Sequence, residues 1–360
     1  MTSLLEKYKE FLPPHLEAGY DLLGEGATPL VQSRRISPSG PLFFKMEQVN
    51  PTGSFKDRFA AVQTALIKSA GIDAFIATSS GNTGAALSAY AARHGLSCLL
   101  FVNEIVPDNK LTQMLAYGAQ VFRVKDFGLT KELSAPIFKR LQHLAEEENI
   151  PLVISAYKYC PEGMEGVKTI AYEIVEQLDV VPGHVFVPVG GGGLLTGIWR
   201  GFDDLRRRGI LGTIPRIHAV QPELNDTLVT PLNLGQSVGR EVGTTTTISG
   251  LAVQVDIDAS AALQCVKESG GSGHLVTDED ILRAQKILSE KEGVYVEPAG
   301  AASVAGYMKA LSTGSLDAEE TAVCILTGHG LKGGADLDAS TRRPVDISGG
   351  EITRDILCTL

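Results

Sequence analysis

A lysine lies in a turn that contains glycine and serine, in the stretch "NPTGSFKDRF" at residues 50–59. This residue, Lys56, stands just ahead of a segment with helical periodicity. A lysine in such a place is usually an ordinary surface residue. Its amine becomes a nucleophile only when it loses its proton, and burial away from water favours that neutral form. Other motifs in the chain decide between these two interpretations.

Four consecutive glycines follow an apolar strand in "VPVGGGGLLTGIWRGF" at residues 187–202. Because glycine lacks a Cβ, this backbone can approach a ligand closely. The helix expected after the glycines offers unpaired N–H groups and a partial positive charge at its start. A tight turn alone needs only one or two glycines. The loop therefore predicts an anion site that suits phosphate.

The glycine loop does not match the common nucleotide motifs. A dinucleotide site requires G-x-G-x-x-G, but counting from Gly190 places Leu195 at the last position. The next strand ends at Gln221, where a ribose-binding acid would be expected. No Gly-Lys-Ser/Thr follows the glycines, which excludes a Walker loop. A ligand with a single phosphate is therefore favoured over NAD or ATP.

Two further junctions between strand and helix carry polar residues. In "ATSSGNTGAALSAYAARHG" at residues 77–95, hydroxyls, an amide and backbone N–H groups suit a carboxylate or a phenolate, although helix capping would also explain them. In "CILTGHGLKGG" at residues 324–334, Thr327 ends a strand beside two glycines, and a turn with a satisfied hydroxyl is the alternative. His329 is interpreted as a turn residue rather than a base.

A phosphate cradle, a carboxylate-binding turn and a lysine in a loop together predict pyridoxal 5'-phosphate as the cofactor. This cofactor needs a lysine for a Schiff base and is anchored through one phosphate. It acts as an electron sink for carbanions of amino acids. Under this hypothesis Lys56 is the lysine that holds the cofactor.

The elements that position these residues alternate along the chain. Short apolar runs alternate with segments of helical period, which is typical of a βαβ protein with parallel strands. We expect strands at residues 42–47, 73–78, 97–102, 119–124, 184–189, 216–221 and 321–326. We expect helices near residues 57–70, 83–94, 108–117, 130–148, 165–178, 194–208, 278–292 and 299–312. The fold class is therefore α/β.

The arrangement of these elements predicts two domains. Residues 58–155 contain βα units of their own and form a smaller α/β domain. It is inserted into a larger cofactor-binding domain made of residues 1–57 and 156–360. Residues 221–250 are rich in Thr and Gly and lack periodicity, so we expect a long functional or covering loop. The tail at residues 336–360 is polar and weakly patterned, and its role is open.

Composition limits the partners. The formal net charge is −10, and Lys and Arg do not cluster beyond "RRR" at residues 206–208, which argues against nucleic acid and anionic membranes. No apolar run is long enough to cross a membrane, and the first residues lack an apolar core, so we expect a cytoplasmic protein. No cysteine spacing suggests zinc, so we expect no structural metal. The cysteines expected to be reduced core thiols are Cys98, Cys160, Cys265, Cys324 and Cys358.

From about residue 24 to residue 333 the chain resembles threonine synthases of the tryptophan-synthase-β-like (fold type II) family. The segments that carry the resemblance, in the family's order, are "NPTGSFKDR", "SSGNTGAALSAYAARHG", "GMEGVKTIAYEIVEQL", "PVGGGGLLTGIWRGF", "EPAGAAS" and "TGHGLK". The resemblance implies two doubly wound open sheets, with the active site between a large lobe and a smaller inserted lobe. It also implies a homodimer that acts on a small amino acid.

The resemblance further implies a role for each matching residue. Lys56 resembles the catalytic Schiff-base lysine, Asn82 the partner of the cofactor's phenolic oxygen, and Thr327 the hydroxyl that faces the pyridine nitrogen. The residues that match the family's phosphate loop are Gly190, Gly191, Gly192, Gly193 and Leu194. The residues that match the turn for the substrate carboxylate are Ser79, Ser80, Asn82 and Thr83. A hydroxyl at the ring nitrogen does not enforce a pyridinium, which favours elimination or replacement over transamination.

One departure bears on the substrate. Threonine synthases usually carry an Arg that helps to hold the substrate's phosphate where this chain has Gly163. If O-phosphohomoserine is the substrate, another cation must supply the missing charge, and the lysines considered are Lys110, Lys158 and Lys168.

The leading hypothesis is a carbon–oxygen lyase of the threonine synthase type, which eliminates the phosphate of O-phosphohomoserine and adds water at Cβ to give L-threonine. One alternative is β-elimination or β-replacement on serine, threonine or an O-activated serine. Another is a binding protein without chemistry, against which the intact lysine argues.

Overall fold

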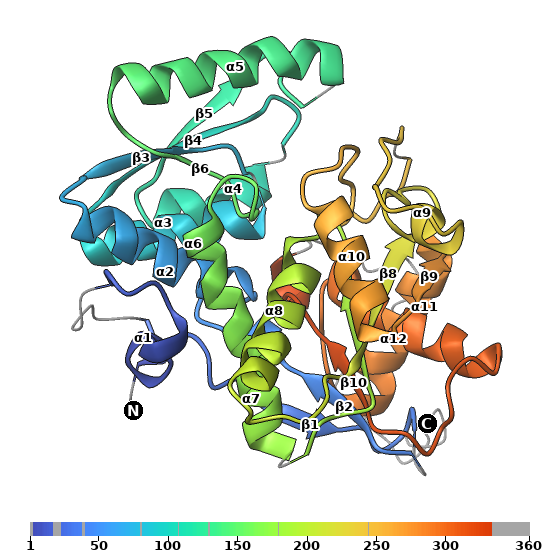
Figure 1. The fold of residues 1–360 in the computed structure, drawn as a ribbon. Helices are drawn as coiled ribbons and strands as arrows, with labels where there is room; N and C mark the ends of the chain where they lie inside the picture. Colours follow the sequence, from blue (N-terminus) through green and yellow to red (C-terminus); the bar gives the residue numbers. More distant parts are fainter. Residues whose placement is uncertain are drawn as a thin grey trace, which may run out of the picture.

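The structure is a computed structural model of the 360-residue chain. It describes residues 3–16, 23–37, 40–79, 81–106, 108–128, 130–178, 180–243 and 245–332. Within these ranges the chain forms two sheets, each with helices packed on both faces (Figure 1). Ser80, Cys358 and the tail at residues 336–360, for which predictions were made, lie outside the described residues.

The larger sheet has six strands, and all neighbours run parallel except the edge pair β1 and β2. In spatial order the strands are β1 (Leu30–Gln32), β2 (Leu42–Lys45), β10 (Ala322–Ile325), β7 (His184–Pro188), β8 (Arg216–Pro222) and β9 (Gly273–Val276). Every residue of β7 and β10 is buried, as expected for central strands covered on both faces.

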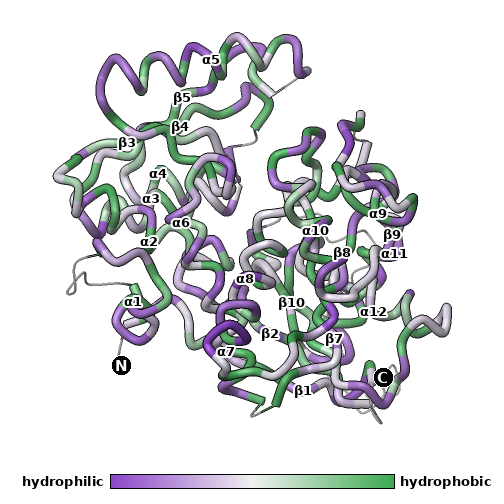
Figure 2. Tube along the Cα trace, in the orientation of Figure 1, coloured by the Kyte–Doolittle hydropathy of each residue, from purple (hydrophilic) through white to green (hydrophobic). Residues whose placement is uncertain are grey.

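The smaller sheet has four parallel strands. In spatial order they are β5 (Gln120–Val124), β4 (Ser97–Asn103), β3 (Ala74–Ala77) and β6 (Leu152–Val153). One face carries α5 (Lys131–Glu147), and the other carries α2 (Lys56–Ser69), α3 (Asn82–His94) and α4 (Asp108–Ala116) (Figure 1). Hydrophobic residues run along the strands, whereas hydrophilic and hydrophobic residues alternate along α5 (Figure 2).

The remaining helices belong to the larger lobe or join the lobes. The α-helices are α1 (Leu4–Lys7), α6 (Pro161–Met164), α7 (Thr169–Leu178), α8 (Gly193–Arg207), α9 (Val229–Asn233), α10 (Ala259–Ser269), α11 (Asp278–Ile287) and α12 (Pro298–Ser312). The 3-10 helices are η1 (Lys9–Phe11), η2 (Glu47–Val49), η3 (Glu165–Lys168) and η5 (Gly330–Lys332), and a π-helical turn, η4, covers Leu288–Glu292.

Alternate residues of the central strands face two different hydrophobic cores. Val185 and Val187 of β7 pack in the core that contains α8 and α10 and continues into the smaller lobe. Phe186, between them, packs in the core formed with α11 and α12. The first core joins the two lobes, because it also contains Phe59 of α2 and Phe75 of β3.

A buried set of charged side chains fixes the first turn of α2 to the larger lobe. The Arg58 guanidinium donates to both carboxylate oxygens of Glu47 and both of Glu173, over 2.7–2.8 Å. Lys45 Nζ donates to Glu173 Oε2 over 2.7 Å. All four side chains are buried. Removing one partner of such a pair would leave an uncompensated buried charge, which is strongly destabilising.

The expected strands and the α/β class are confirmed, with ends that differ by one or two residues. The segment expected as one helix at residues 165–178 is instead η3 followed by α7. Three strands, β1, β6 and β9, and the helix α10 were not predicted. The strands of the smaller sheet all lie between residues 74 and 153, whereas the larger sheet draws its strands from both sides of that range. The exact domain boundaries stay a prediction.

Two further observations concern the described residues only. Cys98, Cys160, Cys265 and Cys324 are buried free thiols, as predicted for these four. None of the described helices is both long enough and apolar enough to cross a membrane.

Candidate active site

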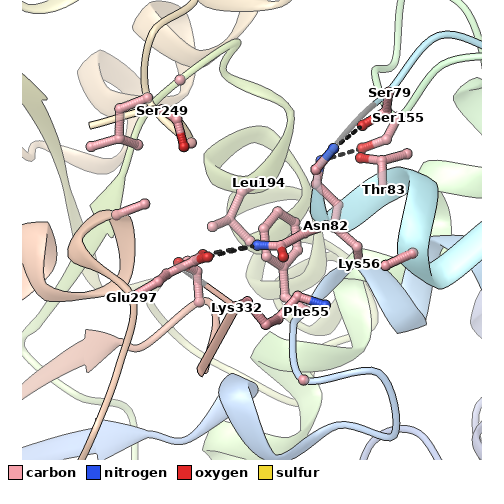
Figure 3. A pocket seen from close by; sticks show the side chains of 18 of the residues that line it. Phe55, Lys56, Ser79, Asn82, Thr83, Ser155, Leu194, Ser249, Glu297 and Lys332 are labelled. Carbon is pink, nitrogen blue, oxygen red and sulfur yellow. Dashed lines mark hydrogen bonds between the residues drawn. The ribbon is translucent and has the colours of Figure 1, made fainter. Parts of the chain in front are cut away.

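A cavity of about 1360 Å³ lies where the carboxyl ends of strands from the two sheets face each other. Ligands of open parallel sheets bind at this edge. The lining residues come from the segments 48–56, 78–85, 110–116, 153–156, 188–194, 247–258, 295–299 and 327–332. Figure 3 shows several of these side chains pointing toward one another from both lobes. The sequence motifs that predicted chemistry are therefore brought together around one cavity.

Lys56 is the first residue of α2 and lines this cavity. Its Nζ donates a hydrogen bond to Ser155 Oγ and lies 4.7 Å from the centroid of the Phe55 ring (Figure 3). Burial lowers the pKa of Lys56 to about 8, although the carboxyl groups of Asp258 and Glu297 act in the opposite direction. A substantial fraction of this amine is therefore neutral near pH 8, which is the form that acts as a nucleophile.

The turn that carries Lys56 is attached to the end of β10. The Phe55 N–H donates to the Thr327 carbonyl oxygen over 3.0 Å, and Ser54 forms an antiparallel bridge with Gly328. These contacts join the "GSFK" segment to the "TGHG" segment, which lies far away in the sequence. The larger lobe therefore sets the position of the amine, even though α2 packs in the smaller lobe.

The glycine loop between β7 and α8 lines the cavity as predicted. Gly192 has a φ of +99°, a conformation that favours glycine, and a Cβ there would lie 2.6 Å from the Asp258 carbonyl oxygen. A Cβ at Gly190 would lie 3.0 Å from the carbonyl oxygen of Gly250. At Gly191 the nearest protein atom would be 3.8 Å away. The loop is thus closely packed on the protein at two positions and open at the one between them.

The loop leads directly into the start of a long helix. α8 begins at Gly193, and Gly193 and Leu194 both line the cavity. The first N–H groups of a helix have no partner inside the helix, and the helix dipole adds a partial positive charge there. This end of the cavity can therefore bind a phosphate through backbone groups alone.

Asn82, at the start of α3, meets a carboxyl group that sequence reasoning did not single out. Its Nδ2 donates to both carboxylate oxygens of Glu297, over 2.9 and 3.0 Å (Figure 3). Burial raises the pKa of Glu297, against the opposite effects of the Asn82 hydrogen bond and the nearby lysines Lys332 and Lys110. Thr327, also predicted, lines the same part of the cavity and is buried.

The predicted turn for the substrate carboxylate lies at the edge of the smaller sheet. Ser79 and Thr83 both line the cavity, and the Ser79 hydroxyl accepts a hydrogen bond from the Gly81 N–H over 3.3 Å. A Cβ at Gly84 would lie 2.1 Å from the Ser79 carbonyl oxygen, so a glycine there allows the turn to pack on α3. Ser80, the fourth residue of the prediction, lies outside the described residues.

The structure separates the lysines that were considered as phosphate ligands. Lys110 lines the cavity. Lys168 does not, because its Nζ lies 2.6 Å from carboxylate oxygens of both Glu165 and Asp204, so the prediction for Lys168 was wrong. Lys158 is not among the lining residues either.

Gly163 does not face the cavity. It lies in α6, and a Cβ there would lie 2.3 Å from Gln63 Oε1 and 3.0 Å from a ring carbon of Phe59, both on α2. An arginine at this position would first have to displace these side chains of α2.

Four cavity residues were missed by sequence reasoning: Ser155, Asp258, Glu297 and Lys332. Glu297 and Lys332 stand inside the quoted motifs "EPAGAAS" and "TGHGLK", which was the available signal. Ser155 follows β6, a strand of only two residues that gave no periodicity.

These residues fit pyridoxal phosphate. The cavity combines a phosphate-sized cradle that is open at Gly191 with a deprotonatable amine at Lys56, and it places a hydroxyl at Thr327 and an amide at Asn82. The fold and the cavity are those of a fold type II pyridoxal-phosphate enzyme. The chain belongs to the family described as "Pyridoxal-phosphate dependent enzyme", which matches residues 22–328. Its cofactor is pyridoxal 5'-phosphate.

Comparisons with known proteins agree on one type of relative. The chain is 37% identical to the threonine synthase of Methanocaldococcus jannaschii, over 93% of this chain and 82% of the relative. It is 37% identical to the threonine synthase of Halalkalibacterium halodurans, over 91% of this chain and 89% of the relative.

Solved structures show the same fold. The serine racemase of Dictyostelium discoideum superimposes with a TM-score of 0.70 at 27% identity, and covers 84% of this chain and 92% of its own. A bacterial threonine deaminase, from T.th., superimposes with a TM-score of 0.69 at 25% identity, and covers 89% of this chain and 94% of its own.

Proposed function

We propose that the protein is a carbon–oxygen lyase of the threonine synthase type. It releases phosphate from O-phospho-L-homoserine and adds water at Cβ to give L-threonine. The observation that carries the proposal is the position of Lys56, which lies between a phosphate cradle and a polar turn in a chain 37% identical to threonine synthases. Bound pyridoxal phosphate supplies an electron sink for negative charge at the α-carbon of an amino acid.

In this proposal Lys56 binds the cofactor covalently and moves protons at Cα and Cβ of the substrate. Its lowered pKa supports both roles, because the amine can gain and lose a proton near neutral pH. Thr327 faces the ring nitrogen, and Asn82 faces the phenolic oxygen. The residues assigned to the cofactor phosphate are Gly190, Gly191, Gly192, Gly193 and Leu194, whose backbone lines the cavity.

The substrate carboxylate is assigned to the turn at the start of α3. The residues of this assignment are Ser79, Ser80, Asn82 and Thr83. The helix start favours a negative charge, and the hydroxyls of Ser79 and Thr83 line the cavity. This turn belongs to the smaller lobe, so the substrate is held by one lobe and the cofactor mainly by the other.

A second candidate is β-elimination or β-replacement on serine, threonine or an O-activated serine. One observation favours it: among the described residues, the cavity lining contains no arginine. A smaller or uncharged leaving group would need none.

The two candidates are separated by products. The purified holoenzyme is incubated with O-phospho-L-homoserine, O-phospho-L-serine, L-threonine and L-serine in turn, and threonine, phosphate, ammonia and oxo-acid are measured. We expect threonine and phosphate in equal amounts from O-phospho-L-homoserine, with the highest kcat/KM of the panel. No threonine, together with turnover of a serine derivative, would assign the enzyme to the second candidate.

We also propose a cytoplasmic homodimer, from the resemblance to the family, and a smaller domain at residues 58–155 inserted between residues 1–57 and 156–360. The separate four-stranded sheet supports these boundaries. Sedimentation of the holoenzyme at micromolar concentration tests the dimer, and a monomer mass would contradict it.

A further inference from the structure

Lys110 and Lys332 both line the cavity, and their ammonium groups are bound differently. Lys332 Nζ donates to the Thr52 carbonyl oxygen over 2.6 Å and to Gln113 Oε1 over 2.8 Å. Lys110 Nζ makes one hydrogen bond to the described residues, to Ser249 Oγ over 3.4 Å. Because an ammonium group has three donors, Lys110 keeps more capacity for a ligand.

Lys110 and Ser249 reach this contact from different lobes. Lys110 lies in the first turn of α4, in the smaller lobe, and Ser249 lies in the covering loop after β8, in the larger lobe. Figure 3 shows Ser249 on the opposite side of the drawn site from Ser155. Both Lys110 and Ser249 are accessible to solvent, so the contact is at the mouth of the cavity.

An ammonium group beside a hydroxyl is a donor pair that suits the oxygens of a phosphate monoester. The chain carries a net charge of −10, which opposes the approach of a dianion, so a cation at the cavity mouth has a local effect on binding. The other lysines that were considered are excluded by position, since Lys168 is paired with two carboxylates and Lys158 does not line the cavity.

We propose that Lys110 and Ser249 form the subsite for the leaving-group phosphate, and that Lys110 is the residue that selects a phosphorylated substrate. The inference rests on the proposed function, from which it takes the substrate. When the Cγ–O bond breaks, the bonding electron pair leaves with the phosphate oxygen, and the Lys110 ammonium balances that charge. Ser249 donates a second hydrogen bond to the same group.

The first test compares substrates in matched variants. Lys110→Met removes the charge with little change in side-chain length, Lys110→Arg retains it, and Lys158→Met is the control lysine outside the lining. We expect Lys110→Met to raise KM for O-phospho-L-homoserine about tenfold, since a charge-assisted hydrogen bond is lost. Turnover of L-serine or L-threonine should stay within about twofold. An unchanged KM, or an equal loss on phosphorylated and unphosphorylated substrates, would overturn the proposal.

The second test uses inorganic phosphate and does not depend on turnover. Phosphate is titrated into the holoenzyme by calorimetry, with the cofactor already in place. We expect saturable binding by the wild type and by Lys158→Met, and about tenfold weaker binding by Lys110→Met. No saturable binding by the wild type, or equal binding by all three proteins, would overturn the subsite. If binding depends on Lys110 but the wild type makes no threonine, the proposed function fails and the subsite stands.

Discussion

The amide nitrogen of Asn82 lies 2.9 and 3.0 Å from the two carboxylate oxygens of Glu297, and this pair joins the smaller lobe to the larger one. Glu297 is buried in the cavity wall, and the position of Gly328 depends on it, because a Cβ at 328 would lie 2.2 Å from Glu297 Oε1. The orientation of the Asn82 amide is therefore set by a residue near the start of α12.

The first prediction concerns this pair. Glu297→Ala should weaken cofactor affinity and lower the melting temperature, because the buried Asn82 amide loses its acceptor at a cost of about 1–3 kcal/mol. Glu297→Gln keeps an oxygen acceptor and should lie closer to the wild type in both measurements. Cofactor titration by absorbance and thermal unfolding provide the comparison. Equal behaviour of the two variants would show that the hydrogen bond to Asn82 does not matter.

The second prediction identifies the lysine that holds the cofactor. Borohydride reduction of the holoenzyme should attach the cofactor to Lys56, as located by peptide mass spectrometry. Lys56→Ala should fold with a similar melting temperature and lose turnover by several orders of magnitude, since both cofactor attachment and proton transfer depend on this amine. Label on any other lysine would disprove the assignment.

The third prediction follows from the pKa of Lys56, which burial lowers to about 8. Only the neutral amine attacks the cofactor aldehyde, so the rate at which the cofactor-free protein binds pyridoxal phosphate should rise about tenfold per pH unit below pH 8. Above that pH the rate should level off. Stopped-flow absorbance between pH 6 and pH 9.5 measures it. A rate that keeps rising to pH 9.5 would mean that the amine retains an ordinary lysine pKa.

The fourth prediction separates two adjacent glycines. Gly191→Asp places a negative charge beside the phosphate cradle, at a position where the nearest protein atom to a Cβ would be 3.8 Å away. It should greatly weaken cofactor binding while the melting temperature of the cofactor-free protein stays nearly unchanged. Gly192→Ala should lower that melting temperature, because the residue has a φ of +99° and its Cβ would meet the backbone at Asp258. Identical effects of the two changes would contradict this account of the loop.

The fifth prediction concerns acid stability. His218 Nε2 lies 2.8 Å from His184 Nδ1, and its Nδ1 lies 2.8 Å from Ser272 Oγ, in a chain of hydrogen bonds beneath the larger sheet. Burial, with smaller effects of neighbouring cations, lowers the pKa of His218 to about 3 and that of His274 to about 4. The unfolded chain therefore binds more protons than the folded one between about pH 3 and pH 6.5.

The sign of this difference means that stability falls as the pH drops below about 6.5. Each histidine contributes a slope of at most ~1.4 kcal/mol per pH unit. His218→Gln should reduce the loss of melting temperature between pH 6.5 and pH 4.5, whereas His143→Gln, on the exposed side of α5, should not. The same acid sensitivity in wild type and His218→Gln would remove the buried histidines as its cause.

The fold was predictable where the pattern is local. Lys56 and the start of α2, the four glycines and the start of α8, and most strands are within one or two residues of their expected positions. β6 escaped prediction because two residues carry no period. β9 escaped because it follows a long irregular stretch, and because its pairing with β8 is a contact distant in sequence.

The site was predictable only in part, for a physical reason. The residues named from motifs are those whose chemistry is evident from their neighbours in sequence, such as Asn82 at a helix start. The role of Glu297 depends on which side chain faces it across the cavity, and Glu297 also has a local explanation as the residue before a helix-initiating proline. Lys168 looked available for the same reason, since Asp204, its partner, lies on another helix.

The hydrogen bond from Phe55 to Thr327 divides the labour of the enzyme between the lobes. Lys56, Thr327 and the glycine loop keep their mutual positions through contacts with the larger lobe, whereas Ser79, Thr83 and Lys110 belong to the smaller one. Substitutions in the smaller lobe can therefore alter which amino acid is accepted without disturbing the chemistry common to all of them. Such an architecture lets new substrate preferences evolve from a preserved reaction centre, one lobe drifting while the other stays fixed.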